Sequence, residues 1–479
     1  MQNNSTILDA LKKYYNCRII PMHMPGHKRN VECATYLSEL SAHLDITEID
    51  GFDNLHDPQE LLAVAMQNAA DLWQSKASYF LVNGSTCGIL ASVRSVAGNG
   101  GEVIVARNCH KSVYNAIELC GLTPHFILPP TDNTFGIYGS IKPEQIKDEL
   151  NAHPNTKLII LTSPTYDGVI SDIESICKIA HSKNVPVLVD EAHGAHLGFY
   201  GFPNSAVKSG ADIVIQSLHK TLPSLTQTAI AHVNGNIISP QKIASQLAIF
   251  ETSSPSYLLM ASIDSCVHLI QEDGERLFEQ WQSALQQFDN AVKSLQHLKV
   301  LGFGTDKTQN HPSIFNFDKS KIVISTQGTN FSGTELAQFL RNEYKIEIEM
   351  SSTNYVIAMT GLGDTKSSIL ELTDALCGID TNCNSCPNQT TSVVLPTLPK
   401  NNFNISEALS LPCEMATIHD AIGKTIGEYI WAYPPGVPII IPGEQVDSNL
   451  ICVLESFCKI GVNLKSTSGG IPNLIKVLK

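Results

Sequence analysis

Two polar side chains at the ends of apolar, strand-like runs have the chemistry of a cofactor site. Lys220 ends the segment Asp212–Lys220, in which a hydroxyl and an imidazole precede the amine. Asp190 ends the run Val187–Asp190. Pyridoxal 5'-phosphate (PLP) is held by an amine that forms a Schiff base, an acid beside the ring nitrogen, and phosphate donors. The pattern predicts a PLP site with Lys220 as the attachment point and Asp190 as the partner of the ring nitrogen.

A second segment is typical of a phosphate site. A strand-like run, Tyr79–Val82, is followed by small and hydroxyl residues and then by a helix-like run at 89–97. The amides and hydroxyls at a helix amino terminus bind anions, although the same letters also suit an ordinary helix cap. Ser217 and His219 lie close enough to Lys220 in the sequence to contact the same phosphate. The predicted phosphate residues are Gly84, Ser85, Thr86, Ser217 and His219.

Two histidines complete the predicted site. His110 also follows a strand-like run, and its imidazole is suited to stack on the pyridine ring. His193 follows Asp190 by three residues and is suited to hydrogen-bond the cofactor or to move a proton. For His110 the competing interpretation is a surface histidine.

Other site chemistries fit less well. His193 and His196 are spaced by three residues, but neither a Cys-x-x-Cys…His-x-x-x-His nor a His-Glu-x-x-His pattern is present. Asp190–His193 has the letters of a helicase box, but the chain has no Gly-x-x-x-x-Gly-Lys-Ser/Thr phosphate loop. Cys383 and Cys386 form a lone tight pair in a polar, turn-rich segment, so we expect a surface loop there and no metal.

Bulk composition narrows the class of protein. The chain has 479 residues, of which 43% are hydrophobic and 16% charged, as expected of a globular protein with two or three domains. The formal net charge of −14 argues against nucleic acid or an anionic membrane as the main partner. The 13 scattered cysteines, and the lack of a visible signal peptide or membrane-length apolar run, predict a cytoplasmic location.

The order of patterns predicts an α/β protein. Residues 1–50 are expected to form an entry arm, and 51–255 a PLP-binding large domain with about seven mostly parallel strands covered by helices. The apolar runs are Tyr79–Val82, Val103–Ala106, His125–Leu128, Leu158–Leu161, Val185–Val189, Ile213–Ile215 and Ala229–Val233. Open sheets of this kind bind ligands at the carboxyl ends of their strands, where Lys220 and Asp190 are expected.

The rest of the chain changes character. Residues 256–380 are predicted to form a smaller α+β domain, with a helical region at Ser262–Leu295 and strands at Lys321–Ser325, Ile346–Met350 and Tyr355–Met359. A linker is expected at 381–402, and a carboxyl-terminal domain at 403–479.

Taken together, these segments closely resemble the Orn/Lys/Arg decarboxylase family of fold-type-I PLP enzymes. The matching segments run in order along nearly the whole chain: His23–Lys28, Asp53–Pro58, Asn83–Thr86, Arg107–Ser112, Ser163–Gly168, Asp190–His193, Ser217–Lys220, Ser254–Leu259 and Tyr433–Ile439. Any one of these segments is a weak signal, but the ordered set is specific. The resemblance is to the short form, which lacks the amino-terminal response-regulator-like domain called the wing.

The resemblance implies an aspartate-aminotransferase-like large domain, a small α+β domain and a carboxyl-terminal decarboxylase domain. It implies that Lys220 forms the Schiff base, that Asp190 pairs with the pyridinium, and that His110 stacks on the ring. A homodimer with active sites at its interface is implied as well. Cys87 stands where many relatives have Ser, Thr or Gly, which weakens the expectation of a side-chain phosphate contact there.

The reaction expected from the resemblance is α-decarboxylation of a basic L-amino acid, with arginine and lysine as the leading substrates and ornithine as a third. The cationic substrate tail needs acidic partners, for which Glu48, Asp50, Asp53 and Glu444 are candidates. One alternative is an aminotransferase or lyase on the same fold, which would need a carboxylate clamp such as Arg107 or Arg341. The other is a PLP-binding protein without catalysis.

Overall fold

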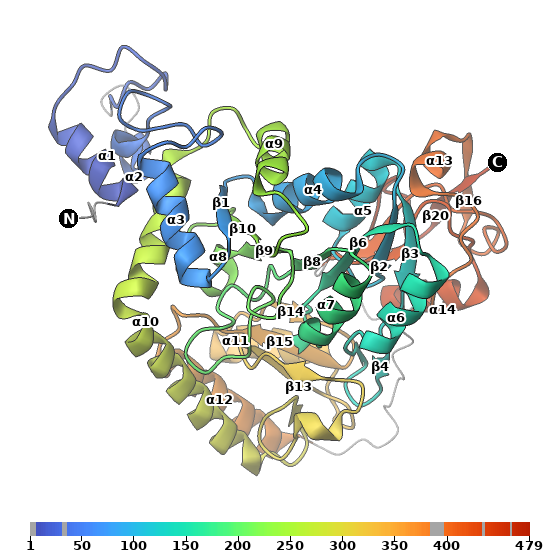
Figure 1. The fold of residues 1–479 in the computed structure, drawn as a ribbon. Helices are drawn as coiled ribbons and strands as arrows, with labels where there is room; N and C mark the ends of the chain where they lie inside the picture. Colours follow the sequence, from blue (N-terminus) through green and yellow to red (C-terminus); the bar gives the residue numbers. More distant parts are fainter. Residues whose placement is uncertain (1–5, 31–35, 384–396, 434–435, 460–461) are drawn as a thin grey trace. The chain divides into compact units, whose positions relative to one another are not determined.

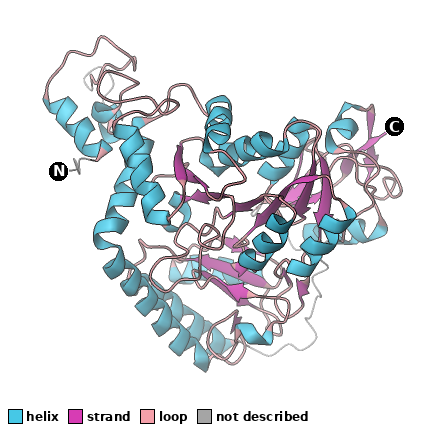
Figure 2. Ribbon diagram, in the orientation of Figure 1, coloured by secondary structure: helices cyan, strands magenta, loops and turns pink. Residues whose placement is uncertain are grey.

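The structure is a computed structural model, and it describes residues 6–30, 36–383, 397–433, 436–459 and 462–479. The chain forms two compact units: Met1–Ser95 with Leu188–Glu279, and Val96–Val187 with Gln280–Lys479. Figure 1 labels the elements, and Figure 2 distinguishes the helices from the strands.

The first unit contains the amino-terminal helices and part of a sheet. Its helices are α1 (Ile7–Asn16), α2 (Tyr36–Glu39), a 3-10 helix (Ala42–Leu44), α3 (Leu61–Trp73), α4 (Gly84–Ala97), α8 (Leu218–Thr221), α9 (Pro240–Phe250) and α10 (Tyr257–Ala291). Helix α4 continues two residues past the unit's limit at Ser95, and α10 continues 12 residues past the limit at Glu279. Its strands are β1 (Ala77–Leu81), β8 (Val187–Asp190), β9 (Ile213–Ser217) and β10 (Ala229–Val233).

The second unit contains the remaining elements. Its helices are α5 (Lys111–Cys120), α6 (Pro143–Ala152), α7 (Ile173–Ser182), α11 (Gly333–Tyr344), α12 (Lys366–Asn382), α13 (Ile405–Ser410) and α14 (Ser448–Lys459), with 3-10 helices at Val292–Ser294 and Thr308–Asn310. Its strands are β2 (Glu102–Ala106), β3 (Thr123–Ile127), β4 (Thr131–Asp132), β5 (Ile137–Tyr138), β6 (Thr156–Thr162), β7 (Val169–Ile170), β11 (Lys299–Val300), β12 (Asn316–Phe317), β13 (Lys321–Ser325), β14 (Met350–Ser351), β15 (Tyr355–Met359), β16 (Cys413–Thr417), β17 (Ile430–Ala432), β18 (Pro438–Ile440), β19 (Leu464–Ser466) and β20 (Leu474–Leu478).

The seven apolar runs of the large-domain sequence all become strands of one sheet, in the order β1-β10-β9-β8-β6-β2-β3. In the first unit β8 and β9 are parallel, while β10 is antiparallel to both β9 and β1. In the second unit β2 is parallel to β3 and to β6. The α/β class with about seven mostly parallel strands is therefore confirmed. Strands β8, β9 and β10 are buried at every position, which explains why their sequences show no polar alternation.

The smaller sheet has the order β11-β13-β15-β14. Strands β13 and β15 match the expected ranges, but the expected strand at Ile346–Met350 is wrong in its first four residues, because β14 begins only at Met350. The amide of Ile346 instead donates to Leu340 O at the end of α11. Glu347 and Glu349, which follow it, bond to other side chains.

The carboxyl-terminal segment has an apolar core of its own. Strands β16 and β20 pair with each other, and β17 pairs with both β18 and β19. Buried residues of these strands and of α14 form the core, among them Ile430, Ile440, Leu454 and Ile475. None of the helices in the described part of the chain is both long and apolar enough to span a membrane.

Candidate active site

Asp190 and Lys220 lie at the carboxyl ends of neighbouring strands. Strands β8 and β9 are parallel, with Asp190 opposite Ile215, and Lys220 follows β9 on the single turn of α8. The Asp190 side chain is 4% exposed, and its Oδ1 accepts the Ala192 amide at 3.1 Å. Burial raises the pKa of Asp190, while the nearby charge of Lys220 opposes that shift. An added cation next to this carboxylate would favour its ionised form, so its surroundings fit a partner for a protonated ring nitrogen.

Lys220 is held by an imidazole. Its Nζ lies 2.9 Å from Nε2 of His193, and His193 is 8% exposed. A cationic lysine donates this hydrogen bond, so the neutral ring must accept it on Nε2. The two groups that sequence analysis assigned to the cofactor and to proton transfer therefore contact each other.

A buried polar network that no sequence pattern predicts fixes the ends of β8 and β9. The Glu191 amide donates to Ile215 O at 2.9 Å, and Gln216 Nε2 donates to Glu191 Oε2 at 2.7 Å. Glu191 Oε1 also accepts the Ala206 amide at 2.8 Å. Because Glu191 and Gln216 each adjoin a predicted site residue, this network sets the spacing of Asp190 and Ser217.

The predicted phosphate residues gather where α4 begins. Gly84 starts the helix with a φ of +72°, a conformation that glycine adopts without strain. Ser85 Oγ, on the next residue, lies 2.6 Å from Ser217 Oγ at the end of β9. Two hydroxyls beside the amides of a 14-residue helix provide donors for a dianion. Thr86 is exposed on the same turn. The donor set therefore fits the phosphate of PLP.

His219 is engaged elsewhere in this structure. Its Nδ1 donates to Thr228 O at 2.9 Å, and burial lowers its pKa. In the neutral ring Nε2 is then an acceptor, so a phosphate contact requires the cationic form. Its role at the phosphate stays a prediction.

Cys87 does not point a donor at the phosphate residues. Its thiol donates back to Gly84 O at 3.0 Å. Burial, assisted by the charge of Glu251, raises the pKa of Cys87. Glu251 itself accepts the Val82 amide at 2.9 Å, and burial raises its pKa to about 7. Sequence analysis missed Glu251 because it lies far along the chain from the segment that it supports.

His110 belongs to the second unit, where it caps α5. Its Nδ1 accepts the Ser112 amide at 3.2 Å and lies 2.9 Å from Ser112 Oγ. The Lys111 amide donates to Gly436 O at 3.0 Å, and a Cβ added to Gly436 would lie 3.1 Å from the His110 ring. The carboxyl-terminal segment therefore packs against this ring. Stacking of His110 on the cofactor stays a prediction.

A buried ion pair anchors the segment before His110. Arg107 Nη2 lies 3.1 Å from Glu444 Oε2, and both side chains are at most 5% exposed. The same guanidinium donates to Pro438 O at 2.8 Å and to Ile439 O at 3.2 Å. Arg107 and Glu444 therefore hold the carboxyl end of β2 against the chain around β18.

Several residues that were expected to bind the substrate's cationic tail or its carboxylate have other partners in the structure. Glu444 and Arg107 are committed to each other, while Arg341 pairs with Glu347 at the surface. The Asp53 carboxylate accepts the backbone amides of Asn54, Gln59, Glu60 and Leu62, so it organises the loop before α3. Glu48 and Asp50 stay untested candidates. Cys383 caps α12, whereas Cys386 lies outside the described residues.

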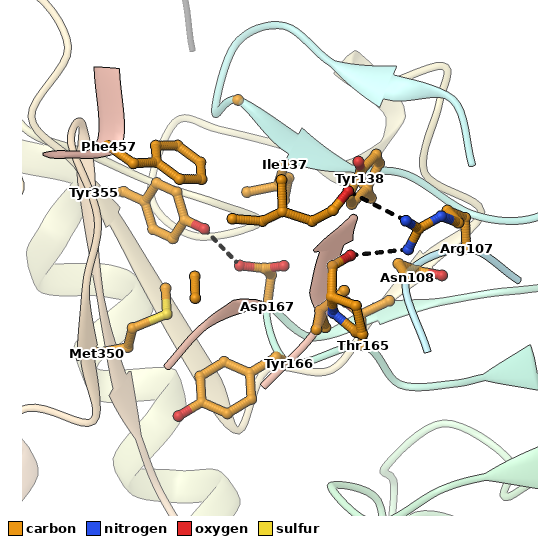
Figure 3. A pocket seen from close by; sticks show the side chains of 15 residues that line it. Arg107, Asn108, Ile137, Tyr138, Thr165, Tyr166, Asp167, Met350, Tyr355 and Phe457 are labelled. Atoms are coloured by element: carbon orange, nitrogen blue, oxygen red, sulfur yellow. Dashed lines mark hydrogen bonds between the residues drawn. The ribbon is translucent and has the colours of Figure 1, made fainter. Parts of the chain in front are cut away.

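The second unit contains a cavity of about 140 Å³ beside Arg107. Figure 3 shows Asp167 pointing toward Tyr355, with Ile137 and Phe457 among the apolar lining. The Tyr355 hydroxyl donates to Asp167 Oδ1 at 3.0 Å. Burial raises the pKa of Asp167 to about 6.

Comparison with known families identifies the chain. Residues 6–368 match the major domain of the Orn/Lys/Arg decarboxylase family, and residues 398–464 match its C-terminal domain. The arginine decarboxylase of Bacillus subtilis (strain 168) is 31% identical over 485 residues, which cover 100% of this chain and 98% of that protein. The arginine decarboxylase of Halalkalibacterium halodurans is 32% identical, covering 91% of this chain and 90% of the relative.

Solved structures agree on the fold. The lysine decarboxylase of Francisella novicida superposes with a TM-score of 0.82 at 19% identity, covering 99% of this chain and 81% of that chain. The ureidoglycine–glyoxylate aminotransferase of Bacillus subtilis has a TM-score of 0.54 at 17% identity, covering 71% of this chain and 89% of that chain. The lysine decarboxylase therefore matches nearly the whole of this chain, whereas the aminotransferase matches only part of it. The chain therefore belongs to the Orn/Lys/Arg decarboxylase family, and it is a PLP-dependent decarboxylase of a basic amino acid.

Proposed function

We propose that this protein decarboxylates L-arginine to agmatine and CO2, a reaction that feeds polyamine synthesis. The choice of arginine rests on the sequence identity of this chain to relatives with each name. Four relatives named arginine decarboxylase are 30–32% identical over at least 91% of this chain. The relatives named lysine decarboxylase reach only 22–23% over 83% of it. Lysine is therefore the second candidate.

We assign Lys220 as the residue that holds PLP covalently and Asp190 as the partner of its ring nitrogen. When bound, PLP accepts the electron pair that the departing carboxylate leaves behind. Buried Asp190, paired with the ring nitrogen, would favour the protonated form of that nitrogen, and the Glu191–Gln216 network keeps Asp190 in place. Ser85 and Ser217, with the first amides of α4, orient the phosphate.

The Lys220–His193 hydrogen bond supports a role in proton transfer. When substrate is bound, the Lys220 amine would be free of the cofactor and could carry a proton to the substrate carbon. His193 Nε2, at 2.9 Å, can exchange that proton. We assign His193 as the group that orients the Lys220 amine and sets its protonation.

We further propose a homodimer and a cytoplasmic location. Fold-type-I enzymes usually complete their sites at a dimer interface, and the family resemblance extends this expectation to the present chain. The exposed free thiols of Cys17, Cys452 and Cys458 suit a reducing compartment. Light scattering coupled to size-exclusion chromatography tests the dimer, because a mass near 52.1 kDa would show a monomer instead.

The test of function is a product assay with the PLP-loaded protein. Arginine, lysine and ornithine are supplied separately, and the amine and CO2 are measured. We expect agmatine from arginine at the highest rate. Preferential release of cadaverine from lysine would overturn the choice of substrate but not the reaction. A keto acid, without CO2, would overturn decarboxylation itself. The Lys220→Ala variant is expected to lose both turnover and the visible absorbance of lysine-bound PLP.

A further inference from the structure

Three potential metal ligands meet in the second unit, at the start of β2. Glu102 Oε2 lies 3.1 Å from His125 Nε2, and the imidazoles of His125 and His153 stack with their centroids 3.4 Å apart. One ligand atom from each of these side chains lies within 4.8 Å of the other two. None of these three residues takes part in the decarboxylation proposed above.

The fold brings these residues together through ordinary strand and helix geometry. Strands β2 and β3 are parallel, with Glu102 opposite Thr123 and Ile104 opposite His125. Because alternate residues share a face of a strand, Glu102 and His125 project from the same face. His153 follows the last residue of α6 and donates its amide to Glu149 O, so it stands at the end of that helix. The cluster therefore joins two strands and a helix.

The ligand set determines which ions fit. We propose that Glu102, His125 and His153 form a binding site for one divalent transition-metal ion, with Zn²⁺ as the best match. Two imidazole nitrogens and one carboxylate oxygen are ligands that Zn²⁺ accepts, with the fourth position left to water or a further side chain. Glu149 Oε2 lies 3.5 Å from His153 Nε2 but is not among the ligand atoms that lie within 4.8 Å of one another.

Solvent access allows an ion to bind reversibly, but the arrangement of the two rings requires one of them to turn. The side chains of Glu102, His125 and His153 are 31%, 18% and 32% exposed, so an ion can reach them from solvent. The two rings are nearly parallel, at 12°. A metal ion lies close to the plane of each imidazole that binds it, so binding must turn one ring out of the stack. His153 can do this, because it lies beyond the helix and is partly exposed.

An ion at this site would fasten β2 to β3 and to the end of α6. The other end of β2 leads to Arg107 and His110. The metal would therefore stabilise the strand that carries those residues without touching the proposed reaction centre. A ligand that binds only the folded protein raises its stability.

The experiment uses the full-length, PLP-loaded protein after treatment with a chelator. The exposed thiols of Cys17, Cys452 and Cys458 are alkylated first, because thiolates are competing ligands for Zn²⁺. Zn²⁺ binding is measured by calorimetry, and Co²⁺ is used as a spectroscopic probe of the ligand field. We compare the wild type with His125→Ala, His153→Gln and Glu102→Gln. The matched control is His419→Ala, which removes a surface His–Glu pair with a 3.1 Å contact.

We expect one Zn²⁺ per chain in the wild type and in His419→Ala. Each ligand variant should bind roughly tenfold more weakly or worse, and Zn²⁺ should no longer raise its melting temperature. Unchanged affinity in His125→Ala and His153→Gln would overturn the proposal, as would an equal loss in His419→Ala. Melting temperatures in chelator separate lost binding from lost folding, and His153→Gln, at a partly exposed helix end, keeps the test available if His125→Ala fails to fold.

Discussion

The Lys220 amine and the His193 imidazole share a hydrogen bond, with 2.9 Å between Nζ and Nε2. Replacing the ring in His193→Gln keeps a polar side chain but removes a group that titrates near neutral pH. We expect PLP to bind and turnover to fall by about 100-fold, within the usual range for general acid–base groups. The pH profile of kcat should change shape as well, which a merely structural role would not produce.

Steady-state kinetics from pH 6 to 9, together with absorbance spectra of the bound cofactor, check this prediction. The control is His297→Gln, at a histidine outside the proposed site. An unchanged kcat and pH profile in His193→Gln would remove the proposed role of the ring.

Removal of the negative charge of Asp190 is expected to lower turnover. Asp190→Asn preserves the shape of the side chain but cannot stabilise a protonated ring nitrogen. We expect the variant to bind PLP through Lys220 and to lose about 100-fold or more in kcat, because an electrostatic contact at the reacting group is removed. Cofactor content is measured by absorbance and turnover by CO2 release. Full turnover with bound PLP would show that Asp190 has no electronic role.

The buried Arg107–Glu444 pair should be strongly coupled. Arg107→Met leaves the Glu444 carboxylate buried without its cation, and Glu444→Gln leaves the Arg107 guanidinium without its anion. Each change should lower the free energy of unfolding by about 3–5 kcal/mol. The double variant Arg107→Met/Glu444→Gln should be clearly more stable than the sum of the single effects predicts. Urea unfolding measures all three, and simple additivity would refute the coupling.

Asp167 should make stability depend on pH. Burial raises its pKa from the usual 3.8 to about 6, so the folded protein binds more protons than the unfolded chain between these values. Its contribution to stability therefore falls as pH rises through that window. Asp167→Asn removes the ionisation while still accepting from Tyr355. At pH 7.5 we expect this variant to be more stable than the wild type by up to about 2–3 kcal/mol.

At about pH 3 the two proteins should be nearly equal, because Asp167 is then largely neutral in both the folded and the unfolded state. Chemical unfolding at several pH values provides the measurement. Asp374→Asn, at an exposed carboxylate of α12, is the control and should show no such difference. A gap that stayed constant from pH 3 to 7.5 would contradict the assignment to ionisation.

The sequence was most informative where burial dictates composition. Strands such as β9, buried at every residue, must be apolar throughout, so their Val- and Ile-rich runs were readable. Strand ends then located Asp190 and Lys220. The expected strand at Ile346–Met350 was mostly wrong because Glu347 and Glu349 there bond to other side chains.

Other site features depend on partners that the sequence does not reveal. Glu444 meets Arg107 across 337 positions of the chain, and no local pattern indicates that pairing. The sequence made Asp53 a candidate for binding the substrate tail, because it does not reveal that backbone amides already donate hydrogen bonds to this carboxylate. The Glu191–Gln216 contact was missed for the same reason, although both residues flank predicted site residues.

The contacts of Gly436, Pro438 and Ile439 with the loop that bears His110 have a consequence for engineering. The Lys111 amide and the Arg107 guanidinium both donate hydrogen bonds to carbonyl groups near the carboxyl terminus. The segment after residue 403 therefore cannot be removed without loss of these contacts. A shortened enzyme that ends at the small domain would keep Lys220 and Asp190 yet lose the contacts that hold the His110 loop. Chimeras within this family should therefore exchange the His110 loop and the tail as one unit.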